Sequence, residues 1–349
     1  MWRPRTVRGS CALAPTLYRS GAEFKGNFGV RTLWKWLPDT VDARVRFFAW
    51  ASLISQILII GTGGAVRLTG SGLGCPTWPR CTEDSYVTTP EMGFHGIIEF
   101  GNRLLTFVLI IIAIGMFLMV VRMRGQRPEL LRLSVALGLG IPGQAVIGGI
   151  TVLTDLNPYV VGLHYLLSAV LVGLAAWLLY RVRVGGASRS AESSVALHTT
   201  LGALLGTLAL SIVVGILVTG SGPHAGDGGA ARNGLDSEFL QHIHSWPSYA
   251  TFALAIAASW LARRQTGRSA TRRLQRVLTG LWLAIAAQIA IGLYQARNGL
   301  PELAVGIHMV LASVLVALTV TALLATRADR SEPERVGQSR PRETAASNS

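Results

Sequence analysis

The sequence predicts an all-α polytopic membrane protein with eight transmembrane helices, arranged as two tandem four-helix bundles. The chain of 349 residues is 50% hydrophobic and only 14% charged, whereas an average soluble domain carries about 25% charged residues. Its charges cluster between apolar runs that are long enough to cross a bilayer, and its two halves repeat each other. These observations exclude a soluble globular enzyme and a disordered chain.

Eight apolar runs define the expected helices, each long enough to cross the hydrocarbon core. The first four runs form an N-terminal bundle within 44–182, and the last four form a C-terminal bundle within 196–326. The spans are 44–65, 97–121, 132–153, 161–181, 196–219, 239–262, 276–296 and 303–326.

The arginines between the helices predict the orientation of the chain. The loops after the second, fourth and sixth helices hold thirteen arginines, and the alternate loops hold four. Because positive charge favours the cytoplasmic side, both termini are expected in the cytoplasm of a multi-pass plasma membrane protein. The net charge of +14 is then better explained by membrane orientation and by contact with anionic lipid than by binding to nucleic acid.

Both ends of the chain are basic. Residues 1–43 are rich in arginine and poor in acids, which is typical of a basic cytoplasmic tail or of a mitochondrial presequence. We favour the tail, and therefore the cell membrane over the mitochondrial inner membrane. Residues 327–349 hold few apolar side chains and are expected to form a disordered cytoplasmic tail.

An internal repeat relates the two halves. Two motifs recur at an offset of 144 residues, and a third recurs between the first and third outer loops. The pairs are QAVIG (144–148) with QIAIG (288–292), VGLH (161–164) with VGIH (305–308), and LTGSG (68–72) with VTGSG (218–222). Four helices per repeat make the repeat parallel, with sites expected inside each bundle.

Polar residues within the spans gather near the outer ends of the even-numbered helices. Such residues are costly in a membrane and usually face a cavity, a partner or a cofactor. They are His95, Glu99, Asn102 and Arg103 on the second helix, His164 on the fourth, Gln241, His242 and His244 on the sixth, and His308 on the eighth.

His244 and His308 come from two helices of one bundle at one depth. Two such imidazoles can supply both axial ligands of a haem iron. An interhelical hydrogen bond is the alternative. Zinc is a weaker candidate, because no third histidine or cysteine lies near by spacing.

The first half differs at the matching positions. His164 matches His308, but Asn102 falls opposite His244 and Glu99 falls opposite Gln241. This asymmetry suggests that one bundle holds a cofactor and the other performs chemistry. Arg103 follows Glu99 by one turn and either keeps its carboxylate ionised or only fixes packing.

Three further groups stand in the outer loops. Cys75 and Cys81 are expected to form a disulfide on the oxidising side of the membrane, with a redox-active dithiol as the alternative. Arg67 is a candidate partner for a haem propionate, as is Arg103, although either arginine can instead neutralise lipid phosphate or Glu99. His224 is expected in solvent.

Taken together, the chain resembles the haem A synthases, membrane enzymes that convert haem O to haem A. The resemblance covers about residues 44–326, with eight spans and the tandem repeat. The matching stretches are GGAVRLTGSGLGCPTWPRC (63–81), IEFGNR (98–103), GGITVLTDLNPYVVGLH (148–164), TGSGPHAGD (219–227), QHIHS (241–245) and GIH (306–308).

The resemblance implies roles for particular residues. His244 and His308 match the histidines that hold a haem b cofactor. His164 matches one of two histidines where the substrate haem is thought to bind, and Glu99 matches a glutamate required for turnover. The implied reaction oxidises the C8 methyl group to a formyl group by successive hydroxylations. Haem O synthase is a partner expected from the pathway, and a homo-oligomer is left open.

The chain also departs from the family pattern. Many members have a histidine where Asn102 stands, so the substrate iron has either His164 alone or His164 with His95. His95 lies seven residues from Asn102, which shifts it by about 10 Å along a helix. We therefore expect His95 to help the site without replacing the missing ligand. The third outer loop also lacks a second cysteine pair.

Two other functional classes compete with this interpretation. A non-catalytic di-haem cytochrome in quinone-linked electron transfer explains the histidines but leaves Glu99 without a role. A transporter also uses parallel repeats, and it predicts helices broken near mid-membrane. Pro142 in the third helix gives that class slight support.

Overall fold

The computed structural model describes residues 35–184, 194–264 and 268–326. From Pro38 onward, the described residues form one compact unit by their contacts, and this unit contains the long helices. The predicted C-terminal tail and nearly all of the predicted N-terminal tail lie outside the described residues. The division into bundles at 44–182 and 196–326 stays a prediction.

Eight long helices follow one another in the described residues, without a strand, which confirms the all-α class. A 3₁₀ turn precedes the second of them (Pro90–Met92) and another follows it (Val121–Gly125). The predicted spans all fall on these helices, with ends displaced by a few residues at most sites. They are α2 (Ala43–Leu68), α3 (Gly93–Val120), α4 (Pro128–Leu153), α5 (Pro158–Val184), α6 (Val195–Ser221), α7 (Ser237–Arg263), α8 (Arg268–Arg297) and α9 (Glu302–Ala325).

Seven of these helices are long and apolar enough to cross a membrane, so the protein is a multi-pass membrane protein. The exception is α7, which has 27 residues and therefore the length but not the apolarity. Its outer half carries Gln241, His242 and His244. The helix that departs from the expected hydropathy is thus one that carries predicted ligands.

The helix starts follow from local sequence. The side chains of Asp42, Ser194 and Asp236 accept hydrogen bonds from backbone N–H groups three residues later, at 3.0, 3.3 and 3.0 Å. These N-caps satisfy N–H groups that have no partner inside the helix. Pro128 begins α4, where a missing N–H costs nothing.

Pro142 lies inside α4, and the helix runs without interruption from Pro128 to Leu153. A proline removes one helical hydrogen bond and usually kinks a helix, but neighbouring helices can compensate in a membrane. The broken helix that a transporter predicts is therefore absent at this position, and Pro142 no longer supports that class.

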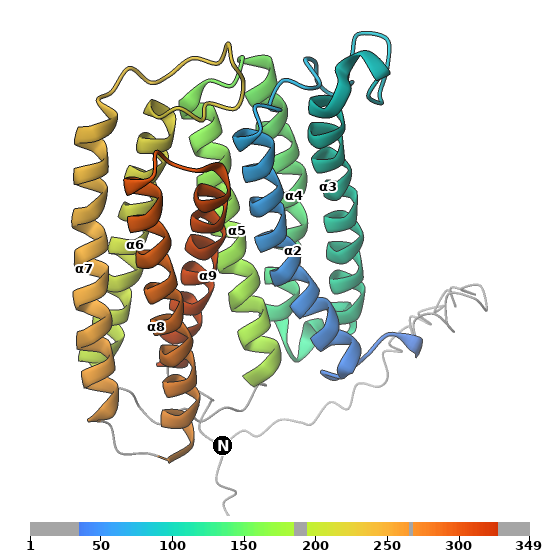
Figure 1. Cartoon of the computed structure of the whole chain (residues 1–349). Coiled ribbons are helices and arrows are strands. Elements are labelled where there is room, and N and C mark those ends of the chain that lie inside the picture. The colour runs from blue at the N-terminus through green and yellow to red at the C-terminus, as the bar shows by residue number, and fades with distance from the viewer. Residues whose placement is uncertain (1–34, 185–193, 265–267, 327–349) are drawn as a thin grey trace, which may run out of the picture. The chain divides into compact units, whose positions relative to one another are not determined.

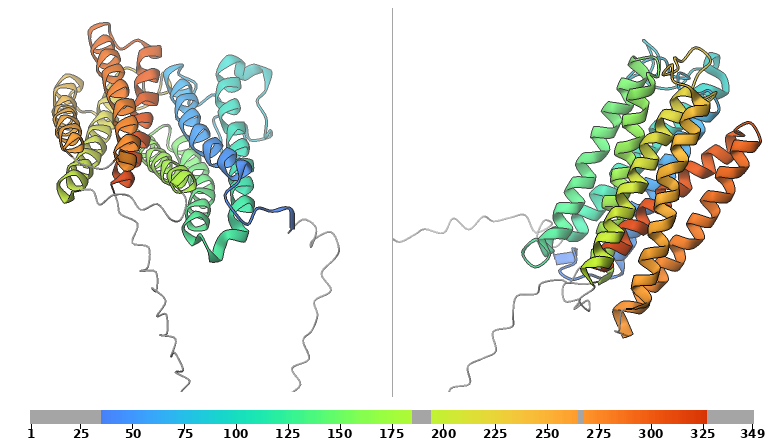
Figure 2. Two further views of the ribbon diagram at one scale, coloured as in Figure 1. Left: turned by 90° about the horizontal axis from the view of Figure 1, so that it is seen from below. Right: turned by 90° about the vertical axis from the view of Figure 1, so that its left-hand side faces the viewer.

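Within each half, the helices form a square with two diagonal pairs (Figures 1 and 2). Helix α2 packs on α3 and α5, and α4 packs on the same two helices, so α3 and α5 lie diagonally opposite. In the same way, α6 and α8 both pack on α7 and α9, which leaves α7 and α9 diagonally opposite. Side chains from diagonal helices can therefore meet only in the interior of each half.

The two halves meet through equivalent helices, as a parallel repeat requires. Helix α5 packs on α9, and the flanking contacts are α2 on α9 and α5 on α6. The Tyr165 hydroxyl donates to the Met309 carbonyl at 3.4 Å, and these two residues occupy equivalent positions 144 apart. The same position of the repeat therefore contributes to the contact from both halves, through a side chain in one and a backbone carbonyl in the other.

Close packing between the halves depends on Gly162 of α5, where an added Cβ would overlap Cγ2 of Ile216 on α6. We expect Gly162→Leu to lower the free energy of unfolding by about 1–3 kcal/mol through overpacking. Thermal unfolding of the purified protein in detergent measures the change. Gly202→Leu is the matched control, because nothing lies within 4 Å of a Cβ there. Equal melting temperatures for both variants would contradict this packing.

Candidate functional site

Three half-buried histidines pack against glycines of neighbouring helices. A Cβ added at Gly148, Gly215 or Gly292 would lie 3.2, 3.0 or 3.2 Å from the Cε1 atom of His164, His244 or His308, respectively. Each glycine therefore leaves the space that an imidazole ring occupies. Gly148 and Gly292 occupy equivalent positions of the internal repeat. The repeat therefore includes the packing of His164 and His308 against these glycines.

In the C-terminal half, His244 of α7 and His308 of α9 face each other from diagonal helices. Their ring centroids lie 6.4 Å apart with an interplanar angle of 62°. The Nδ1 atom of each ring is buried without a hydrogen-bond partner, which costs about 1–3 kcal/mol per group. The Nε2 atom of His308 lies 3.1 Å from Nε2 of Gln288.

This pair fits a haem iron held by two imidazoles. A metal–nitrogen bond is about 2 Å long, and a ring nitrogen lies about 1 Å from its centroid, so a bridged iron puts the centroids about 6 Å apart. The observed separation of 6.4 Å agrees. The unpartnered ring nitrogens and the approach from opposite sides are also what axial ligation needs.

The N-terminal half brings one imidazole to the equivalent place. Neither ring nitrogen of His164 has a hydrogen-bond partner among the described residues, and its Nδ1 atom is buried. Asn102 stands on the diagonal helix α3, where its Oδ1 atom accepts a hydrogen bond of 2.8 Å from the Thr62 hydroxyl. The asymmetry between the halves is therefore a difference between an imidazole pair and an imidazole with an amide.

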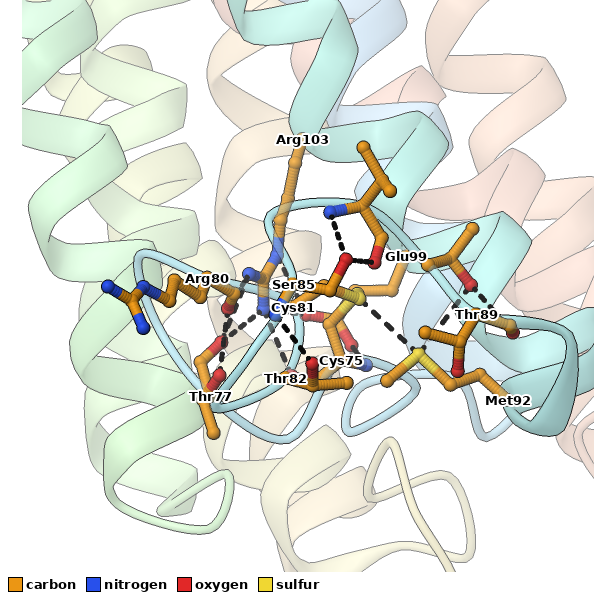
Figure 3. The surroundings of a disulfide bond; sticks show 12 residues. Cys75, Thr77, Arg80, Cys81, Thr82, Ser85, Thr89, Met92, Glu99 and Arg103 are labelled. Carbon is orange, nitrogen blue, oxygen red and sulfur yellow. Dashed lines mark hydrogen bonds and ion pairs between the residues drawn. A yellow bond between two sulfur atoms is a disulfide. The ribbon is translucent and has the colours of Figure 1, made fainter.

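Glu99 is held beneath the first outer loop (Figure 3). The residue is 5% exposed. Its Oε2 atom accepts a hydrogen bond of 2.6 Å from the Cys75 backbone N–H, and its Oε1 atom accepts one of 3.1 Å from Arg103 Nε. Both carboxylate oxygens are thus held in place by donors from the loop and from the same helix.

Arg103 joins that carboxylate to the rest of the loop. Beyond Glu99, its guanidinium donates to the carbonyls of Cys75, Thr77 and Arg80 at 3.0 to 3.1 Å. All three nitrogens of its guanidinium donate within the protein. Its visible role is therefore to join Glu99 to the loop carbonyls, and a propionate contact would have to replace one of these bonds.

Cys75 and Cys81 form a disulfide within this loop, which confirms the expected pairing. Both cysteines are fully buried, and the loop they close contacts Glu99 and Arg103 directly (Figure 3). The disulfide loop is thus part of the surroundings of the carboxylate and not an isolated surface feature.

Arg67, in the last turn of α2, binds the end of α6 and the loop that follows it. It donates to the carbonyls of His224 and Thr219 at 2.7 and 3.1 Å, while the backbone N–H of Gly72 donates to the Gly226 carbonyl at 2.8 Å. The predicted propionate contact of Arg67 stays a prediction.

The solvent position expected for His224 is wrong, because His224 is half-buried and its Nε2 atom lies 2.8 Å from the Leu300 carbonyl.

His95 lies one helical turn before Glu99 and lines an outer cavity. The ring is exposed, and its Nδ1 atom lies 2.9 Å from Ser71 Oγ. The cavity measures about 590 Å³ and is also lined by Leu73, Met92 and Asp227. This volume lies within the usual range for small-molecule sites, so His95 belongs to an outer compartment next to the carboxylate.

Comparison with known proteins now identifies the family. The COX15-CtaA family model, described as cytochrome oxidase assembly protein, matches residues 46–321, which includes almost all of the eight helices. The chain belongs to this family. The match also includes every predicted site residue from Arg67 to His308.

Several relatives of this family are named heme A synthase. The protein from Geobacillus thermodenitrificans is 29% identical over 40% of this chain and 43% of its own length. The chain thus spans less than half the length of this relative in the matched region. The proteins from Sphingopyxis alaskensis and Listeria welshimeri are 27% and 24% identical, and their matches span 78% and 79% of this chain and 89% and 93% of their own lengths.

The hydrogen bonds from Arg103 to the loop carbonyls predict that this residue protects the Cys75–Cys81 disulfide from reduction. Arg103→Ala leaves Glu99 without its ion pair and frees the loop carbonyls; losing one partner of such a pair costs about 3–5 kcal/mol. We expect mild reductant to reduce Cys75–Cys81 roughly tenfold faster or more, measured by maleimide labelling.

Arg80→Ala is the matched control, since it removes an exposed arginine of the same loop while the Arg80 carbonyl still accepts from Arg103. Labelling rates that are the same in the two variants would contradict a protective role for Arg103.

Proposed function

We propose that this protein oxidises the C8 methyl group of haem O to a formyl group and so produces haem A for terminal oxidases. The observation that carries the proposal is the asymmetry of the two bundles. One has a facing pair of imidazoles, and the other has a single imidazole and a clamped carboxylate. Relatives named heme A synthase, two of them matched over most of their length, support the same activity.

The C-terminal bundle is proposed to hold haem b as a resident cofactor. His244 and His308 would be its axial ligands, and the haem would supply one-electron redox chemistry when bound. The ring separation of 6.4 Å and the unpartnered Nδ1 atoms support this assignment.

The N-terminal bundle is proposed to bind haem O as substrate, with His164 as the ligand to its iron. Gly148 packs against the His164 ring in the same way as Gly292 packs against the His308 ring. His95 stands in the outer cavity, at the level where the propionates of a haem would reach toward water, and Arg67 lies at the same outer surface. We assign both residues to the surroundings of the substrate and neither to its iron.

Glu99 is proposed as the catalytic residue. Conversion of a methyl group to a gem-diol takes two hydroxylations, each a two-electron oxidation by an external oxidant that also moves protons, and the gem-diol then loses water to give the formyl group. A carboxylate held by the Cys75 N–H and by Arg103 is positioned to accept and return protons at a fixed place. Arg103 and the disulfide loop then act as positioning groups for that carboxylate.

The setting of the reaction is also part of the proposal. The excess of arginine in alternate loops supports a plasma membrane protein with both termini in the cytoplasm. The site then opens on the outer side, where the disulfide is stable. A haem O synthase in the same membrane would supply the substrate.

Glu99→Gln tests the catalytic assignment. The amide keeps the size of the side chain but cannot take up a proton, so haem A formation should fall about 10²–10⁴-fold. The measurement is haem extraction and chromatography from cells that lack haem A, supplied with haem O synthase and this chain. Glu91→Gln is the control, because Glu91 is exposed on the same side of the membrane.

If the control Glu91→Gln loses haem A formation as Glu99→Gln does, the loss is not specific to Glu99, and Glu99 is no longer assigned as the catalytic residue. If the unaltered chain binds haem b and forms no haem A, the proposal fails and the di-haem cytochrome takes its place.

His244→Ala and His308→Ala test the cofactor site. Each change removes one of two axial ligands, so we expect loss of the low-spin haem spectrum of the purified protein or its conversion to a high-spin form. His242→Ala is the matched control on α7, where the exposed ring accepts or donates only to its own helix at Glu238. An unchanged spectrum in the His244 or His308 variant would contradict the assignment.

A further inference from the structure

The two bundles differ in the side chain opposite the histidine of the repeat, which is His164 in one bundle and His308 in the other. In the C-terminal half, His308 faces the imidazole of His244 from the diagonal helix. In the N-terminal half, His164 occupies the place of His308, and the repeat puts Asn102 of α3 at the place of His244. An imidazole can coordinate iron through a ring nitrogen, whereas a primary amide offers one carbonyl oxygen and two N–H donors.

A hydrogen bond occupies the carbonyl end of that amide. The Thr62 hydroxyl of α2 donates to Asn102 Oδ1 at 2.8 Å. Residue Ile212 stands at the equivalent position of α6 by the offset of 150 that relates the TGSG motifs, and its side chain has no hydroxyl. Among the described residues, Asn102 Nδ2 has no acceptor. With its oxygen engaged, Asn102 presents N–H donors and not an iron ligand.

The other side chains nearby are also engaged. Glu99 has both carboxylate oxygens in hydrogen bonds to Cys75 and Arg103. His95 lies two helical turns outward of Asn102 and contacts Ser71 through Nδ1. Neither group therefore replaces the missing imidazole opposite His164.

We propose that haem bound in the N-terminal bundle is five-coordinate, and that the open face of its iron binds a small neutral ligand such as dioxygen or carbon monoxide beside Asn102. This inference rests on the proposed function, because that function puts haem O in this bundle. The Thr62 hydroxyl orients the Asn102 amide so that an N–H group donates to the bound ligand. The bundle with two imidazoles has no such open position.

Carbon monoxide is the probe that tests this site. The purified full-length protein, carrying its C-terminal haem, is titrated with haem O, reduced with dithionite and exposed to carbon monoxide. We expect one of the two haems to form a carbon monoxide adduct and the other to stay low-spin. Asn102→His should abolish the adduct and give a second low-spin haem, because it restores the imidazole pair of the other half.

Two more variants test the role of Thr62 against a control on another helix. Thr62→Val removes the donor that orients the amide, so we expect a shifted stretching band of bound carbon monoxide with the adduct retained. His242→Ala is the control and should change neither the adduct nor the band, because its exposed ring contacts only its own helix. The low-spin spectrum of the C-terminal haem reports folding in every variant.

The outcomes distinguish this inference from the function on which it rests. If haem A forms but both haems are low-spin and unreactive toward carbon monoxide, the open site is wrong and the function stands. If the adduct forms without haem A production, the site stands and the function is wrong. If His164→Ala and the unaltered chain take up the same amount of haem O, His164 does not hold the substrate iron and the open site is wrong, while haem A formation still decides the function.

Discussion

The outer end of the N-terminal half depends on the ion pair between Glu99 and Arg103. A carboxylate within a membrane helix is expensive unless a partner and hydrogen bonds compensate it. Arg103 is the partner, and the same guanidinium binds three backbone carbonyls of the disulfide loop. One arginine therefore stabilises a charge and orders a loop, and the loop returns a donor to the carboxylate through the Cys75 N–H.

The repeat explains why the two halves can share a framework and still differ in chemistry. Diagonal helices and helical glycines set the depth and orientation of His164 and His308 in the same way. Packing of this kind tolerates little change in volume. The side chain on the diagonal helix differs between the halves: His244 packs on a third helical glycine, Gly215, whereas Asn102 is held by the Thr62 hydroxyl.

Much of this architecture was predictable because hydropathy and periodicity report burial directly. The eight helices, the Cys75–Cys81 disulfide and the equivalence of His164 with His308 all follow from local patterns. The bonds from Arg103 and Arg67 to loop carbonyls do not. A carbonyl acceptor is present at every residue, so no sequence pattern marks the ones that an arginine reaches, and His224 was misplaced for the same reason.

These long-range hydrogen bonds also link the surroundings of Glu99 to the opposite half of the molecule. The first and third outer loops belong to different halves, and they are joined by the Gly72–Gly226 hydrogen bond, while Arg67 binds the third loop from the last turn of α2. A loop attached on one side to Glu99 and on the other side to the opposite half cannot shift without straining both contacts. The position of the carboxylate is therefore a property of the outer loops as much as of α3, because their backbone supplies the donor and the acceptors that hold the ion pair in place.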